Sequence, residues 1–330
     1  MASESLTTST TATALSKAQR RLSDRIGEPG LRGLTWLAAA TSTALILLLI
    51  YKVFAQASEA FSTFGLGFVF KNVWVPTHAE FGGGAFLYGT AVTTFGALLI
   101  AGPMAIAISL FLTEMAPRSV RRPVATLVDL LAAIPSVVLG LWGIIVLCPF
   151  TAKVIEPVLK SVLGWIPLFG GEASPFGLLP AILVLTIMAV PIISAVTREV
   201  FETVPGSLKE GALALGATRW EMVRMVILPY SRSGIVGALI LGIGRALGEA
   251  IAVTMVIGKS EAIHAQLSQP GTSLASTIAD SYQGASTKLE LSSLIYLGAI
   301  LLVLAVIVNL VARLIVRRTT LRAAQAGGLA

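Results

Sequence analysis

The sequence contains few charged residues for its length. Only 12% of its 330 residues are Asp, Glu, Lys or Arg, whereas a soluble domain usually carries about 25%. So few charges cannot cover a surface that faces water. Hydrophobic residues make up 55% of the chain, and the mean hydropathy is +0.85. The composition therefore excludes a soluble globular protein and predicts that lipid surrounds much of the chain.

Cysteine and histidine are almost missing. The single cysteine, Cys148, cannot form a disulfide within the chain. The two histidines, His78 and His264, belong to no Cys/His cluster, and the apolar stretches hold no paired Asp and no Ser with His. We therefore predict no metal, no cofactor and no covalent chemistry for this chain. A membrane enzyme is the competing class of protein, but this chain lacks the catalytic residues that such an enzyme needs.

Long apolar runs are what the sequence has instead. A helix needs roughly 20 apolar residues to cross a bilayer, and its backbone groups must be satisfied within the helix. Six stretches qualify: 34–55, 89–113, 124–147, 178–197, 234–257 and 292–315. The predicted fold is all-α, with six transmembrane helices. Prolines inside the second to fourth stretches predict kinks: Pro103, Pro135, Pro180 and Pro191.

Lysine and arginine gather on one side of these stretches. They crowd the N-terminal tail, the loops after the second and fourth stretches, and the C-terminal tail. Because cytoplasmic loops carry the excess of Lys and Arg, we predict that both termini are cytoplasmic in a bacterial plasma membrane. Residues 1–33 are predicted to be a basic, disordered tail, 34–316 a transmembrane domain and 317–330 a second tail. The net charge of +7 thus indicates orientation rather than nucleic-acid binding.

The cytoplasmic loop at residues 198–233 contains two signals for the start of a helix. Ser207 with Glu210 fits a capping box, and Thr218 with Glu221 fits a second. In such a box the hydroxyl and the carboxylate three residues later each bond a free backbone N–H. The loop is therefore predicted to form two short helices.

Two further residues define how these helices connect. Gly216 stands between them, where a left-handed conformation ends a helix. Pro229 is expected to end the second helix or to reset its direction. A DNA-binding helix-turn-helix has a similar local pattern, but the close flanking membrane stretches would hold any recognition helix against the bilayer.

This loop resembles the EAA motif of ABC importer permeases. The matching residues are Glu210, Gly211, Ala212, Gly216, Val226, Leu228 and Pro229. Gly211 departs from the usual Ala and Val226 from the usual Ile. The resemblance implies the type I importer permease fold, a loop that docks on a separate ATPase subunit, and ATP hydrolysis by that partner.

Four other segments resemble the PstC-type permease of phosphate importers. They are residues 65–68, 134–143, 244–249 and 252–258. The resemblance implies inorganic phosphate as substrate, a PstA-like sister permease, two PstB-like ATPase copies and a PstS-like binding protein outside the membrane. Permeases for molybdate and sulfate share the EAA loop and stay as alternatives. A membrane scaffold that transports nothing is the alternative from a different class.

The fifth stretch contains a pair of charged residues, Arg245 and Glu249. Their spacing of four places them on one face of a helix. A charge inside a membrane normally faces a partner or a water-filled cavity. We predict that Arg245 contacts the translocating phosphate and that Glu249 tunes its charge. An ion pair that only locks helix packing stays open as the alternative.

Two weaker features accompany this pair. Gly244 and Gly248 form a small-xxx-small pattern that would let a neighbouring helix approach closely. Asp129, in the third stretch, is a lesser candidate for the pathway. It is expected instead at a helix N-terminus, where a carboxylate is favourable.

Overall fold

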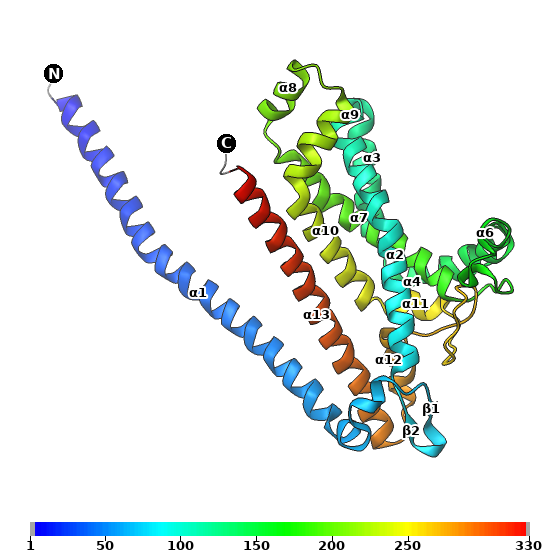
Figure 1. Cartoon of the computed structure of the whole chain (residues 1–330). Helices are drawn as coiled ribbons and strands as arrows, with labels where there is room; N and C mark the ends of the chain where they lie inside the picture. Colours follow the sequence, from blue (N-terminus) through cyan, green and yellow to red (C-terminus); the bar gives the residue numbers. More distant parts are fainter. Residues whose placement is uncertain (1–3, 328–330) are drawn as a thin grey trace. The chain divides into compact units, whose positions relative to one another are not determined.

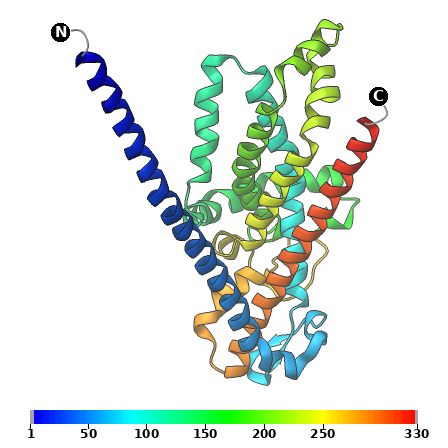
Figure 2. The same cartoon turned by 90° about the vertical axis from the view of Figure 1, so that its left-hand side faces the viewer.

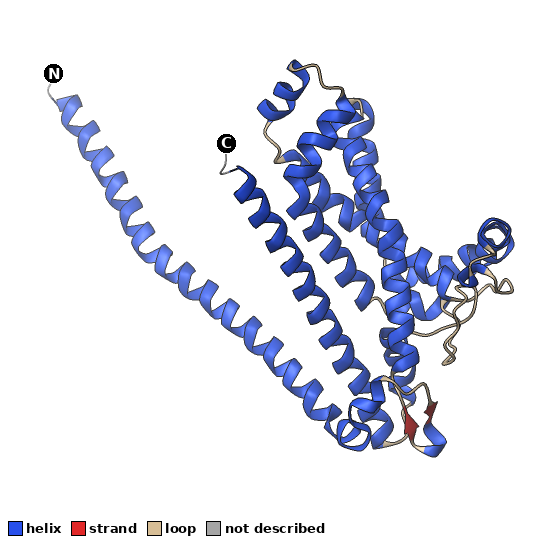
Figure 3. Ribbon diagram, in the orientation of Figure 1, coloured by secondary structure: helices blue, strands red, loops and turns tan. Residues whose placement is uncertain are grey.

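The protein is described by a computed structural model that gives the backbone of residues 4–327 and the side chains of residues 30–314. The chain divides into two units, Met1–Ala55 and Gln56–Ala330. The described residues of the first unit lie within a single helix, α1 (Glu4–Phe64). The second unit contains the end of α1 and all later elements. In the described residues the structure is almost entirely helical, apart from one short antiparallel pair, β1 (Trp74–Val75) and β2 (Glu80–Phe81) (Figure 3).

Six helical segments of the described chain are long and apolar enough to cross a membrane. Each overlaps one of the six predicted stretches, so the all-α membrane fold is confirmed. The segments are Gly30–Val69, Gly84–Met115, Ser136–Leu163, Leu178–Glu202, Arg219–Gly248 and Lys288–Leu314.

Both ends of the chain are helical where tails are predicted. Helix α1 begins at Glu4, and the disorder of residues 1–33 stays a prediction. Once a helix is nucleated, each added residue gains one hydrogen bond, which favours extension from an apolar span. Helix α13 (Lys288–Gly327) likewise continues into the predicted C-terminal tail. Residues 1–3 and 328–330 of these tails lie outside the described residues.

The third predicted span is interrupted. Helix α3 (Arg118–Ala132) ends before Pro135, and α4 (Ser136–Trp142) begins after it. The residue before a proline is held out of the helical conformation, which accounts for the break at Ile134. The membrane-length segment then runs through α5 (Cys148–Phe150) and α6 (Glu156–Leu163). The predicted boundaries 124–147 therefore join parts of two separate helices.

The fifth span is interrupted as well. Helix α9 (Arg219–Met222) leads through a π-helical turn into α10 (Leu228–Gly248). The chain leaves the helix at Glu249, with φ −77° and ψ 112°, and α11 (Ile251–Val256) follows. The prediction of one helix over 234–257 is wrong at this point.

Prolines shape these helices through the turns that precede them. Within residues 4–327, each π-helical turn ends two residues before a proline. Phe111–Met115 precedes Pro117, Gly143–Leu147 precedes Pro149, Thr151–Ile155 precedes Pro157 and Val223–Ile227 precedes Pro229. A proline ring clashes with the carbonyl four residues earlier in a regular helix, and the wider turn relieves this. The helix consequently continues past Pro229, so the first alternative, that it ends there, is wrong, and a change of direction at Pro229 stays a prediction.

The four prolines predicted to kink the helices lie at different places relative to them. Pro103 and Pro191 lie inside α2 (Gly84–Leu110) and α7 (Leu178–Glu202). Pro135 separates α3 from α4. Pro180 lies in the first turn of α7, where a missing N–H costs no helical hydrogen bond.

Helix α7 forms the centre of the second unit. It packs between α2 and α10, with α3 beside its second half (Figures 1 and 2). Its buried side chains include Leu178, Ile182, Leu185 and Ile193. The helices α8 (Gly206–Ala214) and α9 lie at one end of this unit, and the β1–β2 pair lies at the opposite end (Figure 1). Helix α12 (Leu274–Ser281) also lies toward that opposite end.

Candidate functional site

The second helix of the 198–233 loop begins as predicted. Thr218 is its N-cap: the Glu221 N–H donates to Thr218 Oγ1 at 3.3 Å, and the Thr218 N–H donates to Glu221 Oε2 at 2.7 Å. Both halves of this capping box are therefore present.

The first helix of the loop does not begin as predicted. Its N-cap is Pro205, whose side chain has no oxygen to accept a hydrogen bond, and Ser207 lies inside the first turn. The predicted box of Ser207 with Glu210 does not form. Pro205 is extended, with ψ 131°, and the helix follows it directly. The start of α8 is therefore set by the proline.

Gly216 ends α8 in the conformation predicted for it. Its φ is +87°, a left-handed value that favours glycine. The Ala217 N–H donates to the Ala212 carbonyl at 3.1 Å, and the Gly216 N–H donates to the Leu213 carbonyl at 3.0 Å. These two bonds form a Schellman motif, which satisfies carbonyls that the end of the helix would leave free. The turn between α8 and α9 thus has a defined geometry.

An apolar cluster holds the helix pair against the rest of the chain. Three of the EAA-type residues, Ala212, Val226 and Leu228, pack partly buried against it. The cluster itself consists of Phe201, Val204, Met222, Val223 and Ile227. These EAA positions therefore fix the loop on the ends of α7 and α10.

An ion pair that the sequence does not reveal adds a second attachment. Lys209 Nζ lies 2.6 Å from Glu114 Oε1, and the two side chains are only 20% and 13% exposed. Glu114 belongs to the π-helical turn that follows α2. The two residues are 95 positions apart, so no local pattern could have joined them. Low exposure limits screening by salt, which makes this pair stronger than a surface pair.

The outward side of the loop is apolar at its tip. Leu215, at the end of α8, is 91% exposed, and Trp220 on α9 is 66% exposed. Glu210 and Gly216 are also exposed. A single exposed leucine is ordinary on a protein surface. Here Leu215 and Trp220 flank a turn whose backbone is fixed by hydrogen bonds. This combination suits an anchor for a partner protein.

Gly211 offers a direct test of this helix. A Cβ added there would meet nothing within 4 Å, so Ala fits without displacing any neighbour. Because Gly costs a helix interior about 0.5–1 kcal/mol relative to Ala, Gly211→Ala is expected to stabilise α8. Hydrogen exchange of the α8 amides should slow about two- to fivefold. Unchanged or faster exchange in α8 would contradict this expectation.

The charged pair of the fifth span meets at the end of α10. Arg245 lies in its last turn, and its Nη2 is 3.6 Å from Glu249 Oε2. Glu249 itself stands outside the helix, so the two do not share a helical face in the way the spacing predicts. Its Oε1 accepts a hydrogen bond from the Ala252 N–H at 3.2 Å and so supports the start of α11. A side-chain bond of this kind competes with continuing the helix.

The two members of this pair differ in exposure. The Glu249 side chain is 6% exposed, whereas the Arg245 side chain is 42% exposed. Around Arg245, a Cβ added at Gly237, Gly244 or Gly248 would meet nothing within 4 Å. Within the described part of the second unit, no other element therefore packs closely on the Gly244–Gly248 face predicted for close packing. This face of α10 is open to something outside the chain.

Asp129 does not stand where the sequence predicts. It lies near the C-terminal end of α3 rather than at a helix N-terminus. Its Oδ1 accepts a hydrogen bond from Arg198 Nη2 at 2.9 Å. The apparent start of the third span is in fact the interior of α3, so the expected position at a helix N-terminus is wrong.

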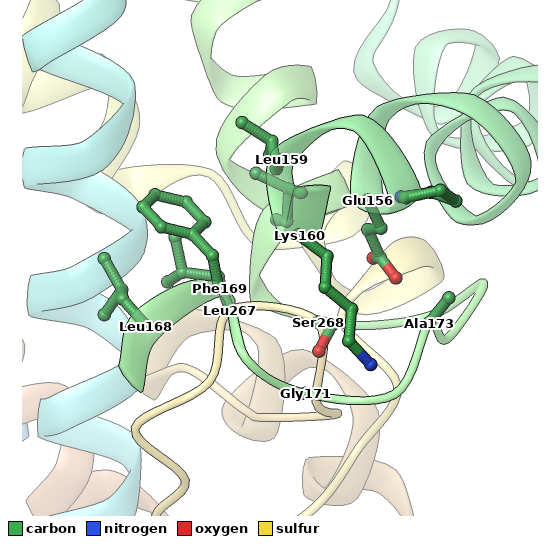
Figure 4. A pocket seen from close by; sticks show the side chains of 11 residues that line it. Glu156, Leu159, Lys160, Leu168, Phe169, Gly171, Ala173, Leu267 and Ser268 are labelled. Atoms are coloured by element: carbon green, nitrogen blue, oxygen red, sulfur yellow. The ribbon is translucent and has the colours of Figure 1, made fainter. Parts of the chain in front are cut away.

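A small pocket lies at the other end of α7, and it is mostly apolar (Figure 4). The Glu156 carboxylate, the Lys160 side chain and the Ser268 hydroxyl border it. Glu156 is 6% exposed, and its Oε2 accepts a hydrogen bond from the Ser174 N–H at 2.9 Å.

These features define a class of protein. A chain with six membrane-length helices carries, at one end, a capped helix pair fixed by an apolar cluster and an ion pair. Near the end of its fifth span, a half-exposed arginine lies beside a buried glutamate. This is the architecture of a membrane transport permease with a docking loop.

Comparison with known proteins gives the family. Residues 105–321 match the family described as binding-protein-dependent transport system inner membrane component, and the chain belongs to this family. The EAA loop lies within the matched residues. The chain is accordingly a multi-pass inner-membrane component of a transport system.

Individual relatives cover most of the chain. The phosphate transport system permease protein PstC of Mesorhizobium japonicum is 42% identical over 294 residues, covering 86% of this chain and 90% of the relative. The protein of the same name from Pasteurella multocida is 43% identical over 286 residues, covering 86% and 87%. A solved bacterial alginate ABC transporter in complex with a pentasaccharide-bound periplasmic protein aligns with a TM-score of 0.57 at 21% identity, over 86% of this chain and 95% of the aligned chain. This likeness bears on the fold alone.

Proposed function

We propose that this chain is a permease subunit of an ATP-driven importer and that it moves inorganic phosphate across the plasma membrane. The PstC proteins to which it is similar over most of its length support the choice of cargo. The single geometric observation that carries the proposal is the unequal exposure of Arg245 and Glu249. A pair that only locks packing within this chain would bury both charges, whereas here the arginine is half-exposed and the carboxylate is buried.

The chemistry of this pair suits a passing anion. A guanidinium presents five N–H donors in a planar fork that matches phosphate oxygens. Glu249, 3.6 Å away, offsets part of the positive charge of Arg245. The anion is then attracted without being held so strongly that it cannot leave. The carboxylate stays in place because it also accepts the Ala252 N–H.

The open surfaces suggest where partners bind. The glycine face of α10 (Gly237, Gly244 and Gly248) is suited to a PstA-like sister permease, with the phosphate path between the two chains. The 198–233 loop would carry its exposed tip, Leu215, into one of two PstB-like ATPase copies, which hydrolyse ATP. A PstS-like protein would deliver phosphate at the opposite end. The excess of Lys and Arg supports cytoplasmic termini.

The cargo can be tested by competition. In a strain that lacks its own phosphate importers, cells expressing this chain with its partner subunits should take up radiolabelled phosphate. A hundredfold excess of unlabelled phosphate should abolish the signal, whereas the same excess of sulfate or molybdate should leave it nearly unchanged. Cells with the Gly216→Pro chain serve as the uncoupled control, because proline cannot adopt a φ of +87°. If sulfate or molybdate competed as well as phosphate, the proposed cargo would be that oxyanion instead of phosphate. If the chain bound the ATPase but no uptake occurred, the membrane scaffold that transports nothing would be favoured.

A further inference from the structure

A charged cavity lies between α3 and α7, at the same end of the second unit as the α8–α9 pair. Its volume is about 690 Å³. Four arginines and two acidic residues line it: Arg118, Arg121, Arg122, Arg198, Asp129 and Glu202. Neither the EAA-type residues (210–229) nor the Arg245–Glu249 pair contributes to this cavity.

Two ion pairs brace the walls of the cavity. Arg121 Nη2 lies 2.7 Å from Glu202 Oε1, and Arg198 Nη2 lies 2.9 Å from Asp129 Oδ1. Each pair joins α3 to α7, so the two helices are tied together on either side of the space. Arg198 is only 15% exposed, which leaves its guanidinium little freedom to move. The shape of the cavity is therefore set before anything binds.

The charges of the cavity do not balance. Both of its acidic residues are taken up by these pairs, and the remaining arginines, Arg118 and Arg122, form no ion pair within the described part of the chain. They lie four apart in the first turns of α3, on the same face. The N-terminal end of a helix carries a partial positive charge that adds to theirs. A concave site with excess charge of one sign concentrates ions of the other sign.

We propose that this cavity binds a phosphate group, held by Arg118 and Arg122. Guanidinium forks bind phosphate oxygens through paired, charge-assisted hydrogen bonds. The ligand is the headgroup of an acidic phospholipid or inorganic phosphate on the side of the 198–233 loop. Leu127 and Leu130, further along the same helix, are exposed apolar residues. The proposal does not depend on phosphate being the transported cargo.

The test uses the full chain with its partner subunits and a matched pair of variants. Arg118→Gln with Arg122→Gln removes the two unpaired charges of the cavity. Arg232→Gln with Arg313→Gln removes two exposed charges outside it. All chains also carry Arg245→Gln, so that the membrane arginine adds no phosphate binding of its own. One arm measures retained phosphatidylglycerol by native mass spectrometry, and the other measures equilibrium binding of radiolabelled inorganic phosphate in phosphatidylcholine nanodiscs.

We expect the cavity variant to bind one of the two ligands at least tenfold more weakly, with the control variant within twofold of the parent. Loss in the lipid arm identifies a headgroup, and loss in the phosphate arm identifies the free ion. The proposal is overturned if the cavity variant changes neither ligand, or if the control variant weakens binding equally. Should the Gln variant fail to assemble, Arg118→Lys with Arg122→Lys keeps the charge and removes the fork. Several-fold weaker binding by that variant supports the proposal, and unchanged binding contradicts it.

Discussion

Arg245→Gln is expected to reduce phosphate uptake by at least about 100-fold while leaving the assembled complex intact. Hydrogen bonds to charged groups contribute about 1.5–3 kcal/mol each, and losing a paired set from the path therefore costs roughly two orders of magnitude in rate. Assembly should survive because the Arg245 side chain is 42% exposed and reaches Glu249 only at 3.6 Å. Uptake of radiolabelled phosphate in reconstituted vesicles, normalised to complex recovered by co-purification, measures the effect.

Two companion variants separate a pathway role from a packing role. Arg245→Lys keeps the charge and loses the planar fork, so its uptake should fall between those of the parent and the Gln variant. Glu249→Gln keeps an oxygen that can accept the Ala252 N–H, but it leaves Arg245 without its counter-charge. Phosphate should then be held more tightly, with a lower KM and a lower maximal rate. If Arg245→Gln leaves uptake unchanged in an intact complex, the pathway role is lost.

Structural features that depend only on residues close together in the chain could mostly be predicted from the sequence. Thr218 and Glu221 stand three apart and form the predicted cap, because both partners of a capping box are local. Gly216 takes the predicted left-handed conformation for the same reason. The predicted cap at Ser207 does not form because Pro205, two residues before it, is the N-cap and starts the helix two residues earlier. The capping pattern was present, but a stronger local signal preceded it.

Helix breaks inside the spans were harder to predict, because hydropathy is averaged over about 20 residues. The break at Pro135 had a visible signal in the proline, yet the apolar run continues across it. The break at Glu249 had no signal in the sequence. The spacing from Arg245 correctly predicted that the two side chains are close. It did not predict that the Glu249 carboxylate would accept the Ala252 N–H at the start of α11. Averaged hydropathy therefore finds spans and misses the points where they bend.

Contacts between distant segments could not be predicted at all. Lys209 and Glu114 each looked like an ordinary charge near the end of a membrane helix, and only the fold brings them to 2.6 Å. The four-arginine cavity has the same origin. Three of its arginines lie at the start of α3 and the fourth, Arg198, lies on α7. Because α3 packs beside α7, these arginines come together around one cavity.

Leu215→Asp is expected to abolish docking of the ATPase subunits without harming the permease itself. The Leu215 side chain is 91% exposed in this chain, so replacing it removes almost no internal contact. In a complex, a buried apolar anchor contributes about 2 kcal/mol or more, and burying a carboxylate in its place adds a further desolvation cost. Together these predict at least a hundredfold weaker association, measured by co-purification of the ATPase and by binding to permease in nanodiscs.

The control is another well-exposed leucine, at the opposite end of the second unit. Leu66 is 71% exposed and lies in the 3₁₀ turn Gly65–Val69 after α1, far along the chain from the 198–233 loop. Leu66→Asp should leave ATPase binding unchanged, and both variants should unfold at the temperature of the parent. Because the Schellman turn at Gly216 and the Lys209–Glu114 pair hold the loop from inside the chain, Leu215→Asp should leave α8 in place and remove only the contact at its tip. Retention of the ATPase by Leu215→Asp would mean that docking uses a different surface of the loop, with Trp220 as the next residue to test.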